Sequence, residues 1–261
     1  MNLVLIGLCI WAVMIVVFSV VWVIQKRIRN AGIVDLVWTF ATGAAGLILI
    51  SQGSAPLFRK LIVASIVAIW SLRLGLYLCK RILSEEEDGR YADMRIAWGD
   101  QFERKIFIFF QLQAVWTVLF AIPMLAAAMN PAESIQWFDF VGIGFFAASI
   151  IGESIADRQL FRFKHNPQNS GQVCRVGLWK YSRHPNYFFE WLHWFAYLFI
   201  SFGSIWMIGS VAGVVVMYLF LTRVTGIPIT EKRVSKTRKA QYEIYQKEVS
   251  PFFPLPVRAG N

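Results

Sequence analysis

The sequence predicts an all-α, polytopic membrane protein with about seven transmembrane helices. Its 261 residues are 57% hydrophobic and only 16% charged, whereas a soluble domain carries about 25% charged residues. Apolar runs of about 20 residues recur along the chain, and a helix of that length crosses the ~30 Å hydrocarbon core of a bilayer. The basic residues also gather in alternate connections between these runs, as they do in multi-pass proteins.

The predicted spans follow one another along the chain with short connections. The first begins near the N-terminus without a basic n-region or a small-residue cleavage site, so we expect a retained helix rather than a signal peptide. We treat residues 1–261 as one transmembrane domain that includes a cytoplasmic loop, 157–185, and a cytoplasmic tail, 223–261. The spans are placed at residues 3–24, 33–51, 58–79, 106–128, 137–156, 186–203 and 205–222.

The distribution of Lys and Arg predicts the orientation. Segments 25–32, 80–105 and 157–185 hold three, six and six of these residues, and the tail from Arg223 holds eight. The positive-inside rule therefore places the N-terminus outside and the tail in the cytoplasm. Such a basic face suits anionic membrane lipids or an anionic cofactor, and we expect no nucleic acid as a partner.

Ionisable residues inside the spans mark candidate functional positions, because each costs on the order of 2.5–3.5 kcal/mol at a helix centre. Asp35 opens the second span, either as a helix cap or as a carboxylate that faces a cavity. In the third span Trp70, Arg73 and Tyr77 share one stripe. Arg73 is either a structural partner of Asp35 or a functional residue.

Two further spans carry polar residues near their cytoplasmic ends. Glu153 and Asp157 lie one turn apart at the end of the fifth span, where Arg158, Arg162 or a ligand hydroxyl can engage them. In the sixth span Glu190 follows Asn186 by four residues. Both side chains therefore point from one face of the helix into the bundle.

The segment WKYSRHPNYFFEW, residues 179–191, leads into the sixth span. Pro185 fits the N-terminus of that helix, where the helix dipole and free backbone N–H groups attract anions. Cationic and aromatic side chains lie on both sides of Pro185 in the sequence. They suit a ligand with phosphates at one end and an aromatic ring at the other. They are Arg183, His184, Lys164, Arg175, Lys180, Tyr181, Tyr187 and Trp179. Headgroup anchoring with an interfacial aromatic belt is the alternative, but it does not require Asn186 and Glu190.

Two other segments have a structural and a functional interpretation. EDGRY places Arg90 after a turn, either in a solvated loop or where it could close over a bound ligand. The tail predicts a helix from about Pro228 to Glu248 with Tyr242 and Tyr245 on one face. It is either a basic surface helix or a lid over the cofactor site.

Other common site motifs are missing from the sequence. There is no GxGxxG after a strand-like run, no Walker motif and no HExxH. The three His and three Cys residues have neither ligand-like nor paired spacing, so we expect no metal site and no disulfide framework.

The block NPQNSGQVCRVGLWKYSRHPNYFFEW, with Asp157 before it and IPITEK, QYEIYQ and SPFFP after it, resembles the steroid 5-alpha-reductase superfamily. Within that superfamily it is similar to the bacterial DUF1295 membrane proteins, as are WSLRL and EDGRY, so the resemblance covers about residues 30–255. It implies a seven-helix reductase in a bacterial inner membrane. Such an enzyme binds NADPH in a cytoplasm-facing cavity and reduces a carbon–carbon double bond conjugated to a carbonyl.

The resemblance also implies roles for individual residues. Asp157, Asn186 and Glu190 match cofactor-contacting positions, Lys164 stands near a position held by Arg, and Tyr242 or Tyr245 matches a tail Tyr. Phe189 replaces the Gly usual before the Glu, and the second span lacks the family's Gln-Glu pair.

The catalytic assignment rests on substitutes for the family's carbonyl-polarising Glu and Tyr. Asp35 stands in for the Glu and Trp70 or Tyr77 for the Tyr. Asp35, kept protonated by its apolar setting, would hydrogen-bond the substrate carbonyl as enolate charge develops. The substrate is expected to be apolar, steroid- or isoprenoid-like, and to enter from the lipid between the first and fourth spans.

Two other functions stay open. RHPNY also resembles the isoprenylcysteine carboxyl and phospholipid methyltransferases, which bind S-adenosylmethionine. Asp157 and the NPxNxG…GLW lead-in favour the reductase. The third possibility is a non-catalytic lipid- or sterol-binding membrane protein, in which the acids are satisfied structural pairs.

Overall fold

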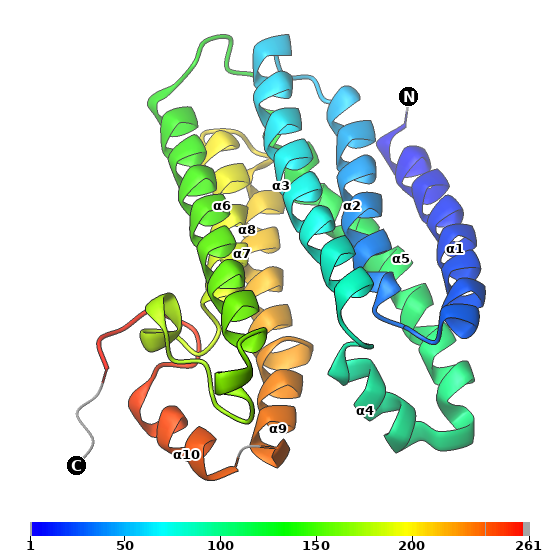
Figure 1. Cartoon of the computed structure of the whole chain (residues 1–261). Coiled ribbons are helices and arrows are strands. Elements are labelled where there is room, and N and C mark those ends of the chain that lie inside the picture. Colours follow the sequence, from blue (N-terminus) through cyan, green and yellow to red (C-terminus); the bar gives the residue numbers. More distant parts are fainter. Residues whose placement is uncertain (1, 238, 258–261) are drawn as a thin grey trace. The chain divides into compact units, whose positions relative to one another are not determined.

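The computed structural model describes residues 2–237 and 239–257, and these form α-helices joined by short turns (Figure 1). The predicted tail therefore includes positions, 238 and 258–261, that lie outside the described residues. The helices are α1 Leu3–Ile28, α2 Ile33–Ser51, α3 Leu57–Ser84, α4 Gly89–Trp98, α5 Phe102–Ala127, α6 Trp137–Lys164, α7 Pro185–Ile200, α8 Met207–Leu219, α9 Ile227–Thr237 and α10 Lys239–Glu248.

Helix length and composition confirm a polytopic all-α membrane protein. Among the described residues, six helical segments are long and apolar enough to cross a membrane: Leu3–Ile28, Ile33–Ser51, Leu57–Ser84, Gly89–Ala127, Trp137–Lys164 and Met207–Ser235. The predicted span 186–203 corresponds to α7, whose 16 residues extend about 24 Å and fall short of a full crossing. The seventh span and the orientation therefore stay predictions.

Local sequence explains where several helices begin. The Asn2 side chain accepts a hydrogen bond from the Val4 N–H and caps α1. Asp88 caps α4 in the same way by accepting from the Arg90 N–H. Within the predicted tail helix, the described residues form α9, Ile227–Thr237, and α10, Lys239–Glu248.

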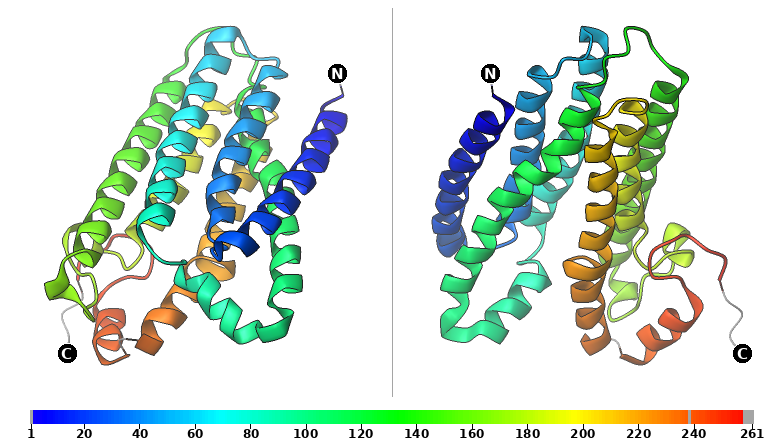
Figure 2. Two further views of the ribbon diagram at one scale, coloured as in Figure 1. Left: turned by 45° about the vertical axis from the view of Figure 1, so that its right-hand side comes forward. Right: turned by 180° about the vertical axis from the view of Figure 1, so that it is seen from behind.

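The chain groups into two compact units. The first comprises Met1–Phe138 and Ile200–Gly213. Within it α1 lies beside α2 and α5, and α2 beside α3 and α5 (Figure 2). Small residues allow this close approach: a Cβ at Gly46 would lie 2.3 Å from Met124 Sδ, and one at Gly43 would lie 2.5 Å from Ser71 Oγ.

The second unit comprises Asp139–Phe199 and Val214–Asn261. It holds most of α6, all but the last residue of α7, and the loop and tail that carry the predicted cofactor residues. The Phe189 ring lies against Gly152 of α6, where an added Cβ would come within 2.3 Å of it. The large Phe189 side chain, at the position where the family usually has Gly, is therefore accommodated by a glycine on the neighbouring helix.

Candidate cofactor site at the start of helix α7

The loop before α7 is fastened to the end of α6. Trp179 Nε1 donates to the Ala156 carbonyl at 2.9 Å, and the Leu178 N–H donates to Gln159 Oε1 at 2.9 Å. Gly177 has a φ of +55°, and a Cβ there would lie 2.1 Å from Gln159 Nε2. Only glycine suits both the backbone conformation and the close approach. The loop thus has a fixed path over the end of α6.

The tail binds the other side of this loop. Ser182 and Ser250 form an isolated parallel bridge, in which the Arg183 N–H donates to the Ser250 carbonyl at 2.9 Å. The Ser182 hydroxyl donates to the Phe252 carbonyl at 2.8 Å, and the Leu255 N–H donates to the Tyr181 carbonyl at 3.0 Å. We call the contacts that residues 173–184 make with Gln159, Glu231 and residues 242–255 the loop–tail clamp.

Glu231 of α9 is the centre of charge in the clamp. Its Oε1 accepts from Arg183 Nε at 2.8 Å and lies 3.2 Å from His184 Nε2, while Gln246 Nε2 donates to its Oε2 at 3.0 Å. Arg183 Nη1 also donates to the carbonyls of Gln246 and Val249, at 3.1 and 2.7 Å. The Arg183 side chain is only 9% exposed. Arg183 and His184, expected to be available for phosphate, instead hold the tail.

Two buried tyrosines of α10 also belong to the clamp. Tyr242 and Tyr245 pack with Val249 in a small apolar cluster. The Tyr245 hydroxyl donates to the main-chain carbonyls of Trp179 and Ser182. Burial raises the pKa of both phenols above the ordinary value of 10.0, so they act as neutral hydrogen-bonding groups. In this arrangement the predicted cofactor tyrosines bind the loop.

His184 and Tyr187 connect the clamp to the first turn of α7. Their rings stack with centroids 5.3 Å apart, and the Tyr187 hydroxyl lies 3.2 Å from Thr230 Oγ1 of α9. Burial lowers the pKa of His184 below 6.5, although its hydrogen bond to Glu231 and the negative charge of Glu231 act in the opposite direction. The cluster thus holds one guanidinium, one carboxylate and an imidazole that favours its neutral form.

Beneath the clamp, α6 and α7 bury several polar side chains. Glu153, Asp157 and Glu190 are all less than 10% exposed. Asn186 is half-buried, and its Oδ1 atom is buried without accepting a hydrogen bond from any described residue. A buried acceptor without a donor costs free energy. This amide therefore has the property expected of a side chain that binds a ligand N–H.

The remaining predicted phosphate ligands lie at the surface. Lys164 and Tyr181 are exposed. Arg175 is also exposed, but it forms an ion pair with Glu248 of α10, and its guanidinium lies 5.4 Å from the Tyr245 ring centre. Lys180, which the sequence also placed near this loop, is exposed like Lys164.

The predicted catalytic acid has a different environment from the one expected. Asp35 Oδ2 accepts from Arg90 Nη2 at 2.7 Å, and its Oδ1 accepts from the Tyr91 hydroxyl at 2.7 Å. Arg81 and Asp88 complete this cluster, with Arg81 Nη2 3.1 Å from Asp88 Oδ2. Although burial opposes ionisation, Arg90 and Arg81 hold the pKa of Asp88 below its usual range. Asp35 thus forms ion pairs and accepts a tyrosine hydroxyl, and Arg90 binds carboxylates of its own unit.

The two aromatic candidates for the catalytic tyrosine lie in the same unit. Trp70 is fully buried and packs edge-on against Trp38, with ring centroids 6.4 Å apart. Tyr77 is half-buried, and the Arg73 guanidinium lies 5.7 Å from its ring centre. Their catalytic role stays a prediction. Arg81 and Arg90 are cations bound to Asp35.

Sequence reasoning overlooked Glu231, Gln246 and Gln159, which determine the shape of the clamp. One signal for these contacts was present in the sequence, which was Glu231, the single acid in IPITEK. A carboxylate among so many cations is expected to pair with one of them. Among the described residues, no group of three or more His, Cys, Asp or Glu side chains is arranged to hold a metal ion.

Comparison with known proteins gives a family and one relative. The family model described as "Protein of unknown function (DUF1295)" matches residues 21–249. A protein of Schizosaccharomyces pombe named "Uncharacterized protein C594.04c" is 25% identical over 270 residues, which cover 90% of this chain and 76% of the yeast protein. No solved structure matches.

Proposed function

The chain belongs to the DUF1295 family, and we propose that it is a membrane-embedded, NADPH-dependent reductase. Its substrate would be an apolar, steroid- or isoprenoid-like molecule with a carbon–carbon double bond conjugated to a carbonyl. The resemblance of residues 157–191 to the steroid 5-alpha-reductases supports the reaction class. The buried Oδ1 of Asn186, which accepts no hydrogen bond from the described residues, is the observation that carries the proposal.

The polar groups of α7 suit the amide end of a nicotinamide cofactor. Asn186 Oδ1 would accept a hydrogen bond from the carboxamide N–H, and the buried Glu190 lies one turn further along the same face. Two such contacts in an apolar setting would fix which face of the ring meets the substrate, and orientation of this kind lowers the barrier by several kcal/mol. When bound, NADPH supplies the hydride for the β-carbon of the substrate.

The loop–tail clamp has a supporting role in this proposal. It holds the main chain of residues 179–184 through hydrogen bonds to α10 and the segment after it. The exposed Lys164 and Lys180 would meet the cofactor phosphates near this fixed loop. The distribution of basic residues predicts the same face to be cytoplasmic, where NADPH is found.

One observation favours the methyltransferase as a second candidate. Glu231 and Glu248 neutralise Arg183 and Arg175, which removes two of the cations expected for phosphate. S-adenosylmethionine carries no phosphate, so it requires fewer cations than a dinucleotide does.

A titration of the purified protein with each cofactor separates the two functions. NADPH should raise the unfolding temperature of the wild-type protein in detergent, and Asn186→Ala should abolish most of that increase. Gln136→Ala, which changes an exposed amide of the first unit, is the matched control and should respond like the wild type.

The outcomes are distinct. Stabilisation by S-adenosylmethionine alone would replace the reductase with the methyltransferase. Stabilisation by neither cofactor would overturn both and leave a lipid-binding protein. An equal response of Asn186→Ala and wild type to NADPH would remove Asn186 from the site.

A further inference from the structure

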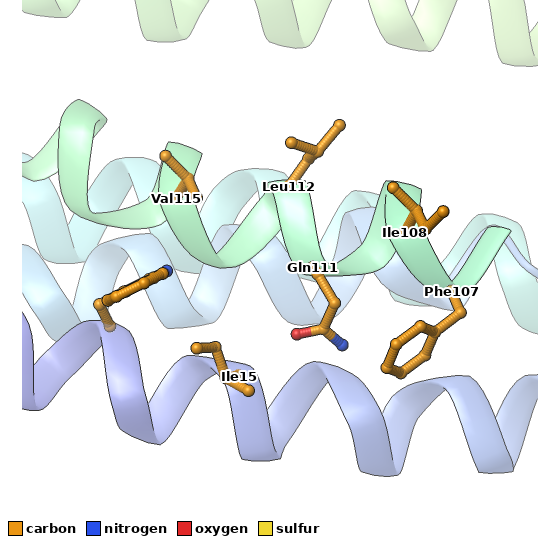
Figure 3. A pocket seen from close by; sticks show the side chains of 7 residues that line it. Ile15, Phe107, Ile108, Gln111, Leu112 and Val115 are labelled. Carbon is orange, nitrogen blue, oxygen red and sulfur yellow. The ribbon is translucent and has the colours of Figure 1, made fainter. Parts of the chain in front are cut away.

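A groove runs along the first unit between α1 and α5, with a volume of about 420 Å³. Both helices belong to segments long and apolar enough to cross a membrane. Ile108 and Leu112 on its rim are about half exposed, so the groove opens toward the surrounding medium, which for a membrane span is lipid. Figure 3 shows its lining, which is Trp11, Ile15, Phe107, Ile108, Gln111, Leu112 and Val115.

Gln111 places one polar group inside this apolar groove. Its side chain leaves α5 toward α1 and lies between Ile15 and Phe107 (Figure 3). Gln111 Nε2 donates to Ser19 Oγ at 3.2 Å, and the Ser19 hydroxyl donates to the Ile15 carbonyl at 2.7 Å. Because the Ser19 proton is already used, Ser19 can only accept from Gln111. The nitrogen of the amide must therefore face Ser19.

This orientation leaves the oxygen of the amide toward the groove. Gln111 Oε1 is buried and accepts no hydrogen bond from the described residues. In a hydrocarbon medium water cannot supply the missing donor, and a bare amide oxygen is costly there. A donor can reach this atom only on a molecule that is itself soluble in the bilayer.

We propose that the α1–α5 groove is a binding site for an apolar lipid with a hydroxyl group, whose O–H donates to Gln111 Oε1. A ketone or an ester has no proton to donate and would leave the amide oxygen bare. An anionic headgroup is disfavoured because no Lys or Arg lines the groove. The volume is within the range of sites that hold one small lipophilic ligand. This site does not depend on the proposed reductase activity.

A second groove provides a natural control. It lies on another face of α1, against α2, with a volume of about 340 Å³. Its lining is Leu5, Ile6, Cys9, Ile10, Val13, Met14, Ala44, Ala45 and Ile48, without an amide or a carboxylate. A lipid chain can enter either groove, but only the α1–α5 groove offers a strong acceptor for a hydroxyl.

The test compares hexadecan-1-ol with its methyl ether, each with a diazirine in the chain, on the full-length protein in lipid nanodiscs. Photolabelled peptides are identified by mass spectrometry. The alcohol should label the lining of the α1–α5 groove about fivefold more strongly than the ether, as the loss of one hydrogen bond predicts. Both probes should label the α1–α2 groove equally.

Three variants sharpen the test. Gln111→Leu should reduce alcohol labelling to the level of the ether, and Val115→Phe should exclude both probes by filling the groove. Ala44→Phe, which narrows the other groove, should leave labelling of the α1–α5 groove unchanged. Equal labelling of the wild type by alcohol and ether would overturn the proposal without any substitution, and so would an unchanged preference in Gln111→Leu.

Discussion

Predicted site residues lie in one charged cluster of each unit, and these two clusters differ in composition. In the first unit, two carboxylates, Asp35 and Asp88, face two guanidiniums, Arg81 and Arg90. In the second unit a single carboxylate, Glu231, faces one guanidinium and one imidazole. The first cluster therefore matches each carboxylate with a guanidinium, whereas the second includes an imidazole whose pKa is lowered by burial.

The surroundings of the two clusters differ as well. Asp35 has partners from α3 and α4 of its own unit, including the Tyr91 hydroxyl. Three residues after Arg183, the Asn186 amide is left outside the second cluster with a buried oxygen that accepts no bond from the described residues. The comparison suggests that the first cluster is structural and that a ligand belongs beside the second. Four measurements test that distinction.

The largest effect is expected from Arg183→Ala. The change removes the buried partner of Glu231 and the donor to two tail carbonyls. An uncompensated buried charge costs on the order of 3 kcal/mol, so the second unit should lose about that much stability. Hydrogen exchange of residues 165–184 and 239–257 measures the loss. Arg175→Ala breaks an exposed ion pair between the same loop and tail and should cost less than about 1 kcal/mol.

A smaller loss is expected from Asp35→Asn. The amide keeps an acceptor for Tyr91, but the charge that faces Arg90 disappears, at a cost of about 1–2 kcal/mol in this partly exposed cluster. Thermal unfolding measures the cost. The response to NADPH should be the same as that of the wild type. If stability is unchanged and only turnover is lost, the predicted catalytic role of Asp35 is restored.

Asn186→Leu should change the stability in the opposite direction. Leucine has a similar size and no buried acceptor, so the protein without cofactor should gain about 1 kcal/mol of stability. The same variant should lose the stabilisation by NADPH. A variant that is less stable than the wild type would show that the Asn186 amide is satisfied within the protein.

The smallest expected effect is a pH dependence of stability that is confined to the second cluster. The pKa of His184 is lower in the folded protein than the ordinary 6.5 because burial disfavours its charged form. As pH falls below 6.5 the unfolded state binds a proton that the folded state does not, so stability decreases. The protection factors of the clamp segments, which correct the exchange rates for the intrinsic effect of pH, should therefore be lower at pH 5 than at pH 7. His184→Gln should remove that difference, and the protection factors in α4 should not change.

Much of the fold was predictable because hydrophobic runs determine membrane helices directly. The predicted span 33–51 coincides with α2, Ile33–Ser51, and the helices α1, α3, α5, α6, α7 and α8 overlap the other predicted spans. Helix α4 was harder, because its polar segment has the composition of a solvated loop. The accommodation of Phe189 by Gly152 was also invisible, since residues on separate helices show no relation in one sequence.

The candidate site was predictable in its location but not in its pairing. The sequence indicated that polar chemistry gathers before α7, and the structure places buried polar side chains there. It did not indicate that Arg183 bonds to Glu231, 48 residues later, or that Arg90 bonds to Asp35, 55 residues earlier. An arginine was one of the partners expected for Asp35, and Arg81 and Arg90 are arginines that bind it. The pairing of opposite charges depends on how helices that are distant in the sequence pack together. The periodicity of one sequence does not encode that packing.

The loop–tail clamp has a consequence for biosynthesis. Ser182 and Arg183 leave the ribosome well before Glu231 and Phe252, which are 48 and 70 residues distant from their partners in the loop. Helix α7 is therefore synthesised while its leading loop is still unfastened. The clamp can form only when the last helices have been translated, so a partly synthesised chain lacks it.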